Sequence, residues 1–207
     1  MIDLYSSPTP NGRKISIMLE ELGVDFNPIL INLDKKEQFS GEFSKISPAN
    51  KIPVIVDNDN NQTVFESGAI LLYLAKKYDK FLNKDKYWEI IQWVFFQMAY
   101  VGPMLGQAHQ YLFYHPGKSK FAEDKTKGYA QHIYSILDKR LFKQEYFSDT
   151  YSIADISIWP WTARYERHQI NLHDYPNVLR WYKQISTRPA VIKGYNSVGE
   201  SYEIPKP

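Results

Sequence analysis

Hydrophobic residues follow two different spacings in the first 80 residues of the chain. Apolar residues from Ile15 to Leu22 recur at helical spacing, and Gly23 is a suitable stop. Short apolar runs bounded by turn residues indicate strands. The predicted order is strand, helix, strand, helix, strand, strand, helix. The strands lie at 2–5 and 26–33, with a strand pair around 54–65. The first helix ends before Gly23, and the other two span 37–46 and 67–78.

The connections between these elements predict how the strands pair. The first two strands are joined through a helix, so they should run parallel with a right-handed crossover. The last two strands are joined by an asparagine-rich turn, so they should run antiparallel. A mixed sheet is therefore expected.

The chain changes character after Lys80, because the periodicity from residue 86 onward is almost entirely helical. Gly102-Pro103 should bend the first of these helices. The sequence thus predicts a domain of strands and helices at residues 1–80 and an all-helical domain at residues 87–200, joined by a short linker. Two predicted helices cover residues 87–114 and 118–142. A third starts at Ser152, where Ser152 and Asp155 form a capping box, and two more start at Pro176 and Pro189.

Composition excludes several classes of function. The 207 residues are 43% hydrophobic and 23% charged, as in ordinary globular proteins, and the formal charge of +2 is too small for a surface that neutralises nucleic-acid phosphates. No apolar run is long enough to span a bilayer, and the N-terminus has no apolar signal segment, so we expect a soluble cytoplasmic protein with no membrane or nucleic-acid partner. The five histidines lack metal-ligand spacing, so no metal is expected.

The chain contains no cysteine. Disulfides, cysteine-bound metals and a nucleophilic protein thiol are therefore excluded. If the chemistry of this protein involves sulfur, the sulfur must arrive with the ligand.

The turn before the first helix is the first candidate site. Two prolines fix this turn, so Thr9 and Asn11 stand at a helix start, where outward-facing N–H groups favour an anion. Both side chains can also donate a hydrogen bond to that anion. The simpler interpretation is that Thr9 or Asn11 only caps the helix.

Two further segments have both a functional and a simpler interpretation. Pro53 opens a strand, and a cis bond after Ile52 would turn the Ile52 backbone toward a ligand, although most bonds before proline are trans. Glu66 and Ser67 open a helix and can act as caps. Together they can also hold an ammonium and a carboxylate, with help from the helix dipole. A peptide-like ligand with an amine and a carboxylate fits that pair.

These segments occur in the order and spacing of one family, because the chain resembles cytosolic glutathione transferases from end to end. The resemblance implies a thioredoxin-like α/β domain followed by an all-α helical domain, with strand and helix order βαβαββα in the first. It is closest to the Nu class, the bacterial glutathione-dependent disulfide reductases. The segments that carry it are 8–12, 47–53 with Ile52-Pro53 as the cis pair, 66–70 as the glutathione-binding signature, 102–107, and 152–156 as the buried capping motif.

The resemblance also implies roles for individual residues. His132 stands where related proteins often place an arginine near the bound peptide, and a neutral histidine would hold a carboxylate less firmly. Tyr5 and Ser7 lie where other classes keep a catalytic residue, but Tyr5 is expected inside the first strand and ranks below Thr9 and Asn11. The implied catalytic residues are Thr9 and Asn11, and the implied glutathione-binding residues are Gln38, Lys51, Ile52, Pro53, Glu66, Ser67 and His132.

The implied function is a glutathione transferase that uses the thiolate of bound glutathione, its co-substrate, as nucleophile and reduces disulfides. One alternative is a binding or regulatory module that keeps the fold without useful catalysis. Another is an isomerase or dehalogenase of the same fold. A small disulfide or electrophile is the expected second substrate. The family also implies a homodimer, with contacts from the helices around residues 88–107 and from the edge of the strand pair.

Overall fold

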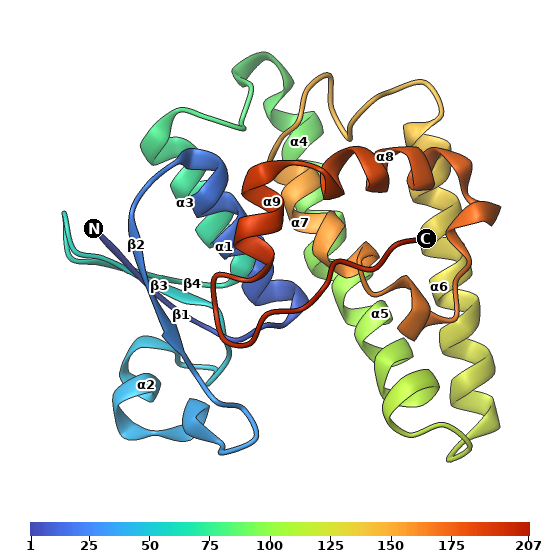
Figure 1. Ribbon diagram of the computed structural model, residues 1–207, viewed down its shortest axis with the longest axis horizontal. Helices are drawn as coiled ribbons and strands as arrows, with labels where there is room; N and C mark the ends of the chain where they lie inside the picture. Colours follow the sequence, from blue (N-terminus) through green and yellow to red (C-terminus); the bar gives the residue numbers. More distant parts are fainter. The chain divides into compact units, whose positions relative to one another are not determined.

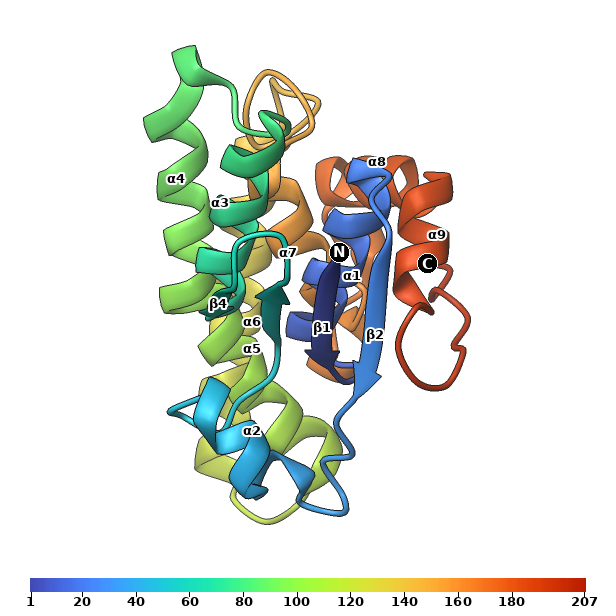
Figure 2. The same ribbon diagram turned by 90° about the vertical axis from the view of Figure 1, so that its left-hand side faces the viewer.

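Four strands form one mixed sheet in the first of two units. The computed structural model describes residues 1–207 and groups Met1–Leu82 with Thr187–Ile204, and Asn83–Ser186 with Pro205–Pro207. In the first unit β1 pairs in parallel with β2, and β3 pairs antiparallel with β4, as predicted (Figure 2). β3 also pairs antiparallel with β1, which joins the two predicted pairs into one sheet. The sheet order is β2 (Phe26–Leu30), β1 (Ile2–Ser6), β3 (Val54–Asp57) and β4 (Gln62–Phe65).

The helices of the first unit begin and end where the sequence supplies caps. Helix α1 (Pro10–Leu22) ends at Gly23, whose φ of 69° is left-handed, and α3 (Ser67–Tyr78) has its predicted bounds. The helix predicted over 37–46 is wrong in its first half. Ser40 accepts a hydrogen bond from the Phe43 N–H and so begins a new helix, α2 (Gly41–Ile46), after a 3₁₀ turn.

Each face of the sheet has its own apolar contacts. Ile2 and Leu4 are buried on one face of β1, and α1 and α3 contact β1 and β3 respectively. Tyr5 lies opposite Val54 in the β1–β3 ladder, and both pack against Phe43 of α2. Tyr5 is therefore a partly buried strand residue that packs against the core, and it lies inside the strand as predicted.

Helix α9 (Pro189–Tyr195) packs on α1, although it is far from α1 in sequence (Figure 1). A Cβ on Gly194 would lie 2.6 Å from the Ile17 Cα, so only glycine permits this approach. Ser16 donates a hydrogen bond of 2.6 Å to the Gly194 carbonyl. These contacts place Thr187–Ile204 with the sheet, whereas the predicted sequence limits of the second domain run to residue 200.

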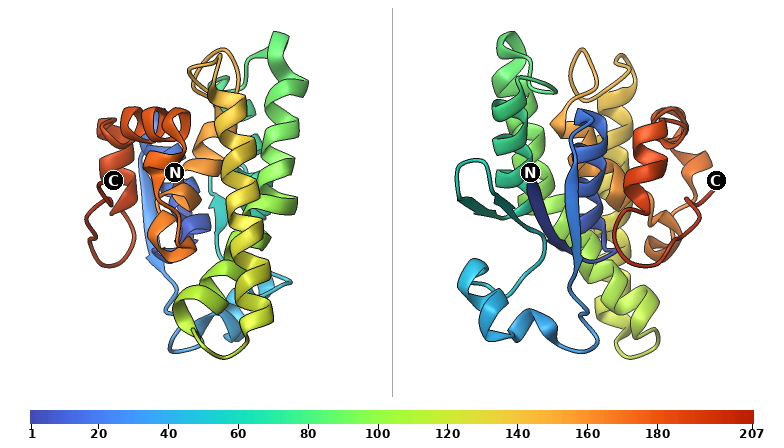
Figure 3. Two further views of the ribbon diagram at one scale, coloured as in Figure 1. Left: turned by 90° about the vertical axis from the view of Figure 1, so that its right-hand side faces the viewer. Right: turned by 60° about the vertical axis from the view of Figure 1, so that its left-hand side comes forward.

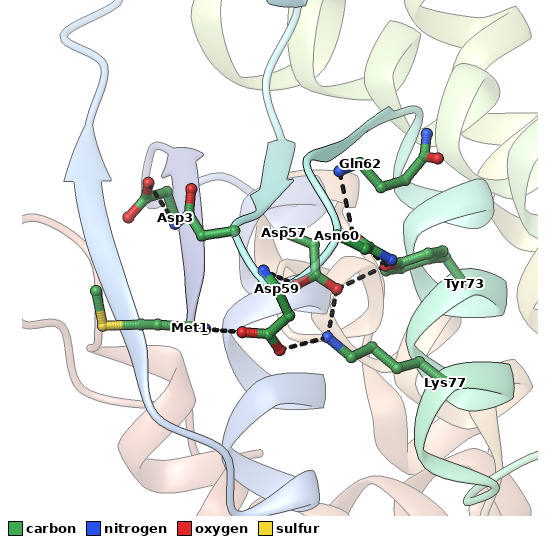
Figure 4. A network of polar contacts seen from close by, with 9 residues as sticks. Met1, Asp3, Asp57, Asp59, Asn60, Gln62, Tyr73 and Lys77 are labelled. Carbon is green, nitrogen blue, oxygen red and sulfur yellow. Dashed lines mark hydrogen bonds and ion pairs between the residues drawn. The ribbon is translucent and has the colours of Figure 1, made fainter.

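A polar network ties the β3–β4 turn to α3 at the end of β3 (Figure 4). The Asp57 carboxylate is buried and accepts hydrogen bonds from the Tyr73 hydroxyl and the Lys77 ammonium. Burial alone would raise the pKa of Asp57, but these two donors outweigh it and hold that pKa below its usual value. The network lies at the opposite end of β3 from Pro53.

The second unit consists of helices only (Figure 3). Its first helical run covers Tyr87 to Tyr114, as predicted. The backbone changes to π-helical turns at Gln97–Val101, just before Pro103, where the missing amide hydrogen removes one α-helical bond. No helix of the protein is both long and apolar enough to cross a membrane. The helices are α4 (Tyr87–Phe96), α5 (Gly102–Ala108), π-helical turns at His109–Tyr114, α6 (Lys120–Leu141), α7 (Ile153–Thr162) and α8 (Pro176–Ser186).

The predicted capping box begins α7 in the core of the second unit. Ser152 accepts from the Ala154 N–H, and the Asp155 carboxylate accepts from the Ser152 N–H at 3.0 Å. The same carboxylate accepts from the Trp181 indole at 2.9 Å and from the Phe147 N–H at 3.1 Å. Complete burial raises the pKa of Asp155 to about 6 in spite of these donors. The box therefore joins three segments of the helical core.

Candidate functional site

The start of α1 is fixed by a cap and by a close backbone contact. The Thr9 Oγ1 accepts a hydrogen bond from the Gly12 N–H at 3.2 Å, so the capping interpretation holds for Thr9. Because a hydroxyl both accepts and donates, this cap does not consume the hydroxyl hydrogen of Thr9. A Cβ on Gly12 would lie 2.2 Å from the Ser7 carbonyl oxygen. Glycine at this position thus allows the turn to fold against the helix.

The start of α3 has a different local geometry. Glu66 has φ 69° and ψ 116°, and its side chain makes no capping hydrogen bond, so the capping interpretation fails for Glu66. A non-glycine residue in such a conformation costs about 1–3 kcal/mol and is found most often at ligand-binding and active sites. The Glu66 carbonyl accepts the first helical hydrogen bond, from Ile70. The strained residue and Ser67, the first residue of α3, both line one hollow.

This hollow, which we call the Asn11 hollow, measures about 200 Å³ and lies within the first unit. It brings together six of the residues predicted from the sequence, drawn from the start of α1, the loop before β3 and the start of α3. The lining residues are Asn11, Ser47, Ala49, Lys51, Ile52, Pro53, Phe65, Glu66 and Ser67.

The loop before β3 is held by its own side chains. The Ser47 hydroxyl donates to the Lys51 carbonyl at 2.8 Å and accepts from the Lys51 N–H at 3.0 Å. Asn50 has a left-handed φ of 53° and accepts from the Ser44 hydroxyl at 2.7 Å. The peptide bond between Ile52 and Pro53 is cis, as the resemblance implied. The loop thus presents Ile52 and the exposed Lys51 to the hollow.

Sequence reasoning missed Lys14. This residue is fully buried on α1, and its Nζ donates a hydrogen bond of 3.2 Å to the Ser67 hydroxyl. Burial lowers the pKa of Lys14 well below its usual value, while the nearby Glu66 carboxylate opposes that shift. The pattern gave no signal, because a lysine in a helix ordinarily faces solvent.

A second hollow lies beside the first, on the Thr9 side of the α1 start. We call it the Thr9 hollow, and it measures about 290 Å³. It forms between the turn before α1, the exit of β2 and the C-terminal tail, all within the first unit. The lining residues are Ser7, Pro8, Thr9, Leu30, Ile31, Asn32, Leu33, Asp34, Gly199, Glu200 and Tyr202.

The tail that borders the Thr9 hollow is fastened to α1. The buried Arg13 guanidinium lies over the Tyr195 ring at 3.5 Å and near the Tyr202 ring at 5.3 Å. The Tyr202 N–H donates to the Asn196 side chain at 2.7 Å. Cation–π contacts of this kind are worth about 0.5–2 kcal/mol. The tail is therefore held, although its polar sequence suggests a loosely held end.

Two predicted site residues lie outside both hollows. Gln38 is in the 3₁₀ turn before α2, and its side-chain oxygen is buried without a hydrogen-bond partner. His132 is exposed on α6 of the second unit, with its ring 6.5 Å from the ring of Tyr100. Neither placement tests the predicted role. No group of three or more His, Asp or Glu side chains is placed to hold a metal ion.

Comparison with known families identifies the family to which this fold belongs. Residues 1–76 match the family model of the glutathione S-transferase N-terminal domain, and residues 100–189 match that of the C-terminal domain. The chain belongs to the glutathione S-transferase family. The expected fold, a thioredoxin-like domain followed by a helical domain, is confirmed.

Several relatives of this glutathione S-transferase are similar over nearly their whole length. The disulfide-bond oxidoreductase YfcG of Escherichia coli is 44% identical over 198 residues, which cover 92% of each chain. A glutathione transferase of Burkholderia graminis, with two glutathione molecules bound per subunit, is 38% identical with a TM-score of 0.89 over 95% of this chain and 88% of that one. A glutathione transferase of Pseudomonas putida, with one glutathione disulfide bound per subunit, is 37% identical with a TM-score of 0.89, covering 94% and 90%.

Proposed function

We propose that the protein is a glutathione-dependent disulfide reductase of the Nu class, which binds glutathione in the Asn11 hollow and uses its thiolate as nucleophile. The observation that carries the proposal is the gathering of Asn11, Lys51 and Glu66 with the cis Ile52-Pro53 bond around one hollow. The relatives support it, because one is a disulfide-bond oxidoreductase and two others bind glutathione or glutathione disulfide.

Each polar group of glutathione has a matching partner in the proposed site. The α-ammonium pairs with the Glu66 carboxylate, and the α-carboxylate lies at Ser67 and the start of α3, where helix N–H groups favour an anion. The cysteinyl amide pairs with the Ile52 backbone in a short ladder. The glycine carboxylate lies toward Lys51 and Gln38. His132 remains a proposed contact for a second glutathione moiety.

The thiol must be ionised to react, and the start of α1 supplies the means. A free thiol has a pKa of about 8.5, so little thiolate exists at neutral pH. A helix start stabilises an anion by about 0.3–1 kcal/mol, and a hydrogen bond to a charged group adds about 1.5–3 kcal/mol. Since one pKa unit is about 1.4 kcal/mol, the helix start and one such donor together lower the thiol pKa by about one to three units. The proposed donors are Asn11, which lines the hollow, and Thr9, which lies next to it at the α1 start.

The reaction consists of two exchanges in which every sulfur comes from a ligand. The thiolate of bound glutathione attacks one sulfur of the substrate disulfide, the substrate S–S bond breaks, and the released thiolate takes up a proton. A second glutathione thiolate then attacks the mixed disulfide, which yields glutathione disulfide and the second substrate thiol. The chain contains no cysteine, so no mixed disulfide with the protein forms.

Alanine variants of the two proposed donors test this mechanism. We expect Asn11→Ala and Thr9→Ala each to lower kcat/KM for disulfide exchange about tenfold at pH 7 and to move the pH–rate profile to higher pH, because each removes a hydrogen bond to the thiolate. The matched control is Asn58→Ala, which removes an exposed asparagine from the β3–β4 turn. Profiles of both variants that coincide with the parent profile would show that neither residue activates sulfur.

The same assays separate the alternative functions. Retention on glutathione-agarose without turnover of any disulfide favours a binding or regulatory module. Higher activity toward a carbon electrophile than toward disulfides favours an isomerase or dehalogenase. The cytoplasmic location stays a prediction.

We further propose that two copies associate through one face of α4. Trp88 and Phe95 are 77% and 65% exposed, and Gln92 and Ala99 lie on the same exposed side of the helical run. Large exposed aromatic residues at helical spacing are typical of a protein interface. Light scattering on Trp88→Glu with Phe95→Glu, compared with the parent protein, tests this. A parent mass of one chain contradicts it.

A further inference from the structure

Lys14 is a buried ionisable group that the proposed reaction does not use. Its side chain is fully buried, yet its amine nitrogen reaches the Ser67 hydroxyl, and Ser67 is part of the lining of the Asn11 hollow. Removing a lysine from water is costly unless a counter-charge is near. A leucine or methionine would fill the same space at less cost, so the lysine at this position needs a physical reason.

We propose that Lys14 is a proton-linked positioning residue: when the α-carboxylate of glutathione docks at Ser67, Lys14 takes up a proton from solvent and becomes the buried counter-charge. The inference rests on the proposed function, because it assumes that a carboxylate occupies this position. Lys14 does not touch the ligand in this arrangement. It acts through Ser67, whose hydroxyl accepts from Lys14 and donates its own hydrogen to the carboxylate.

The charges around Lys14 favour this coupling. Without the ligand, burial disfavours the charged lysine, and the Glu66 carboxylate only partly compensates. The ligand adds a negative charge behind Ser67, in surroundings where solvent screens poorly, and an added negative charge favours the protonated amine. The ligand carboxylate raises the proton affinity of Lys14, whereas the ligand ammonium at Glu66 acts in the opposite direction. We expect the carboxylate to outweigh the ammonium, because it binds the same Ser67 hydroxyl as Lys14, so the protein takes up protons when the ligand binds.

Several other charged groups on α1 and on the elements packed against it have partners of their own; on α3, Lys77 pairs with Asp57 and Asp59. On α1 itself, Arg13 lies over the Tyr195 ring. Near the C-terminal end of α1, Glu20 pairs with Lys193 of α9, and Glu21 pairs with Arg188. On β1, Asp3 accepts hydrogen bonds from two asparagines. Lys51 lines the same hollow as Ser67 but is exposed to solvent.

Calorimetry with S-methylglutathione tests the proposal, because the blocked thiol cannot release a proton. The heat of binding is measured in phosphate and in Tris from pH 6 to pH 9, and the difference between buffers gives the number of protons transferred. We expect uptake by the parent protein and less uptake by Lys14→Met, whose affinity falls about tenfold because the counter-charge is lost. Any proton taken up by the ligand amine at Glu66 is common to both proteins and cancels.

Lys51→Met is the matched control, because it removes a lysine from the same hollow that is exposed rather than buried. It should weaken binding and leave the proton uptake unchanged. A merely structural role for Lys14 predicts weaker binding of Lys14→Met with the same proton uptake as the parent, and that result overturns the proposal.

A second measurement does not depend on the folding of Lys14→Met. The parent protein is titrated with an analogue of S-methylglutathione in which glutaryl replaces γ-glutamyl, so that the ligand has the carboxylate but no amine. Binding without proton uptake at every pH overturns the inference and leaves the proposed function standing. Absence of any binding of S-methylglutathione itself refutes the proposed function instead.

Discussion

The two hollows on either side of the α1 start differ in the residues that form them. The Asn11 hollow is lined by short loops whose own side chains fix them, such as the Ser47–Lys51 pair and the strained Glu66. The Thr9 hollow needs Tyr202 of the tail, which reaches it from the far end of the chain. The first can therefore be recognised from local motifs, and the second depends on tertiary contacts.

This difference suggests a division of roles. The Asn11 hollow has a fixed shape and carries charges of both signs, from Lys51 and Glu66, as an amino-acid-like ligand requires. The Thr9 hollow is larger, and the carboxylates in its lining are those of Asp34 and Glu200. We propose that the first hollow holds the constant co-substrate and that the second admits the variable second substrate.

Disturbing the α1 start should affect both hollows at once and give the largest effect. In Gly12→Ala the new methyl would overlap the Ser7 carbonyl, so the turn must move. We expect a loss of about 2–3 kcal/mol in the free energy of unfolding, measured by urea denaturation, together with at least a tenfold loss of disulfide exchange.

Gly128→Ala is the matched control for that variant. Gly128 lies inside α6, where an added methyl meets no atom within 4 Å. Because alanine is the better helix former, this control should gain up to about 1 kcal/mol in stability. If Gly12→Ala is as stable and as active as the parent protein, the turn tolerates movement and the prediction is wrong.

Relaxing Glu66 should affect the Asn11 hollow alone. Glycine accepts a positive φ at little cost, so Glu66→Gly should gain about 1 kcal/mol in stability while it weakens S-methylglutathione binding about tenfold or more, because the partner of the ligand ammonium is lost. Thermal unfolding and calorimetry measure the two effects. Glu66→Gln is the control, because it loses the charge and keeps the strain. If Glu66→Gly is less stable than the parent protein, the substitution does not release the strain.

Loosening the tail should affect the Thr9 hollow alone and give the smallest effect. Tyr202→Ala removes one ring beside Arg13, a contact worth about 0.5–1 kcal/mol at an exposed site. We expect KM for a small disulfide to rise about two- to fivefold while the affinity for S-methylglutathione stays the same. If Tyr202→Ala raises KM for the disulfide and weakens S-methylglutathione binding to the same extent, the proposed division of roles is wrong.

The sequence predicted the fold because most of its signals are local. The cap at Thr9, the stop at Gly23 and the capping box of Ser152 each act within a few residues, and all three are present in the structure. Where a local signal was overlooked, the prediction failed: Ser40 begins a helix of its own and leaves Phe39 63% exposed.

Residues of the site that act through distant contacts were not predictable in the same way. Lys14 has the polarity of a surface residue, and only the packing of α1 on α3 shows that it is buried behind Ser67. The contact of Tyr202 with Arg13 likewise joins two ends of the chain. The sequence of one turn was enough to identify Thr9 and Asn11 as site residues. That they line two different hollows could be seen only in the folded first unit.

The packing of α9 on α1 has a consequence for biosynthesis. The sheet unit cannot be completed when residue 82 leaves the ribosome, because α9, which covers the apolar surface of α1 at Ile17, belongs to the segment 187–204. At translation rates of about 5–20 residues per second, the nascent chain waits roughly 5–20 s with that apolar surface bare. During this interval chaperones or neighbouring nascent chains have access to α1, and a truncated product that lacks α9 would keep it exposed permanently.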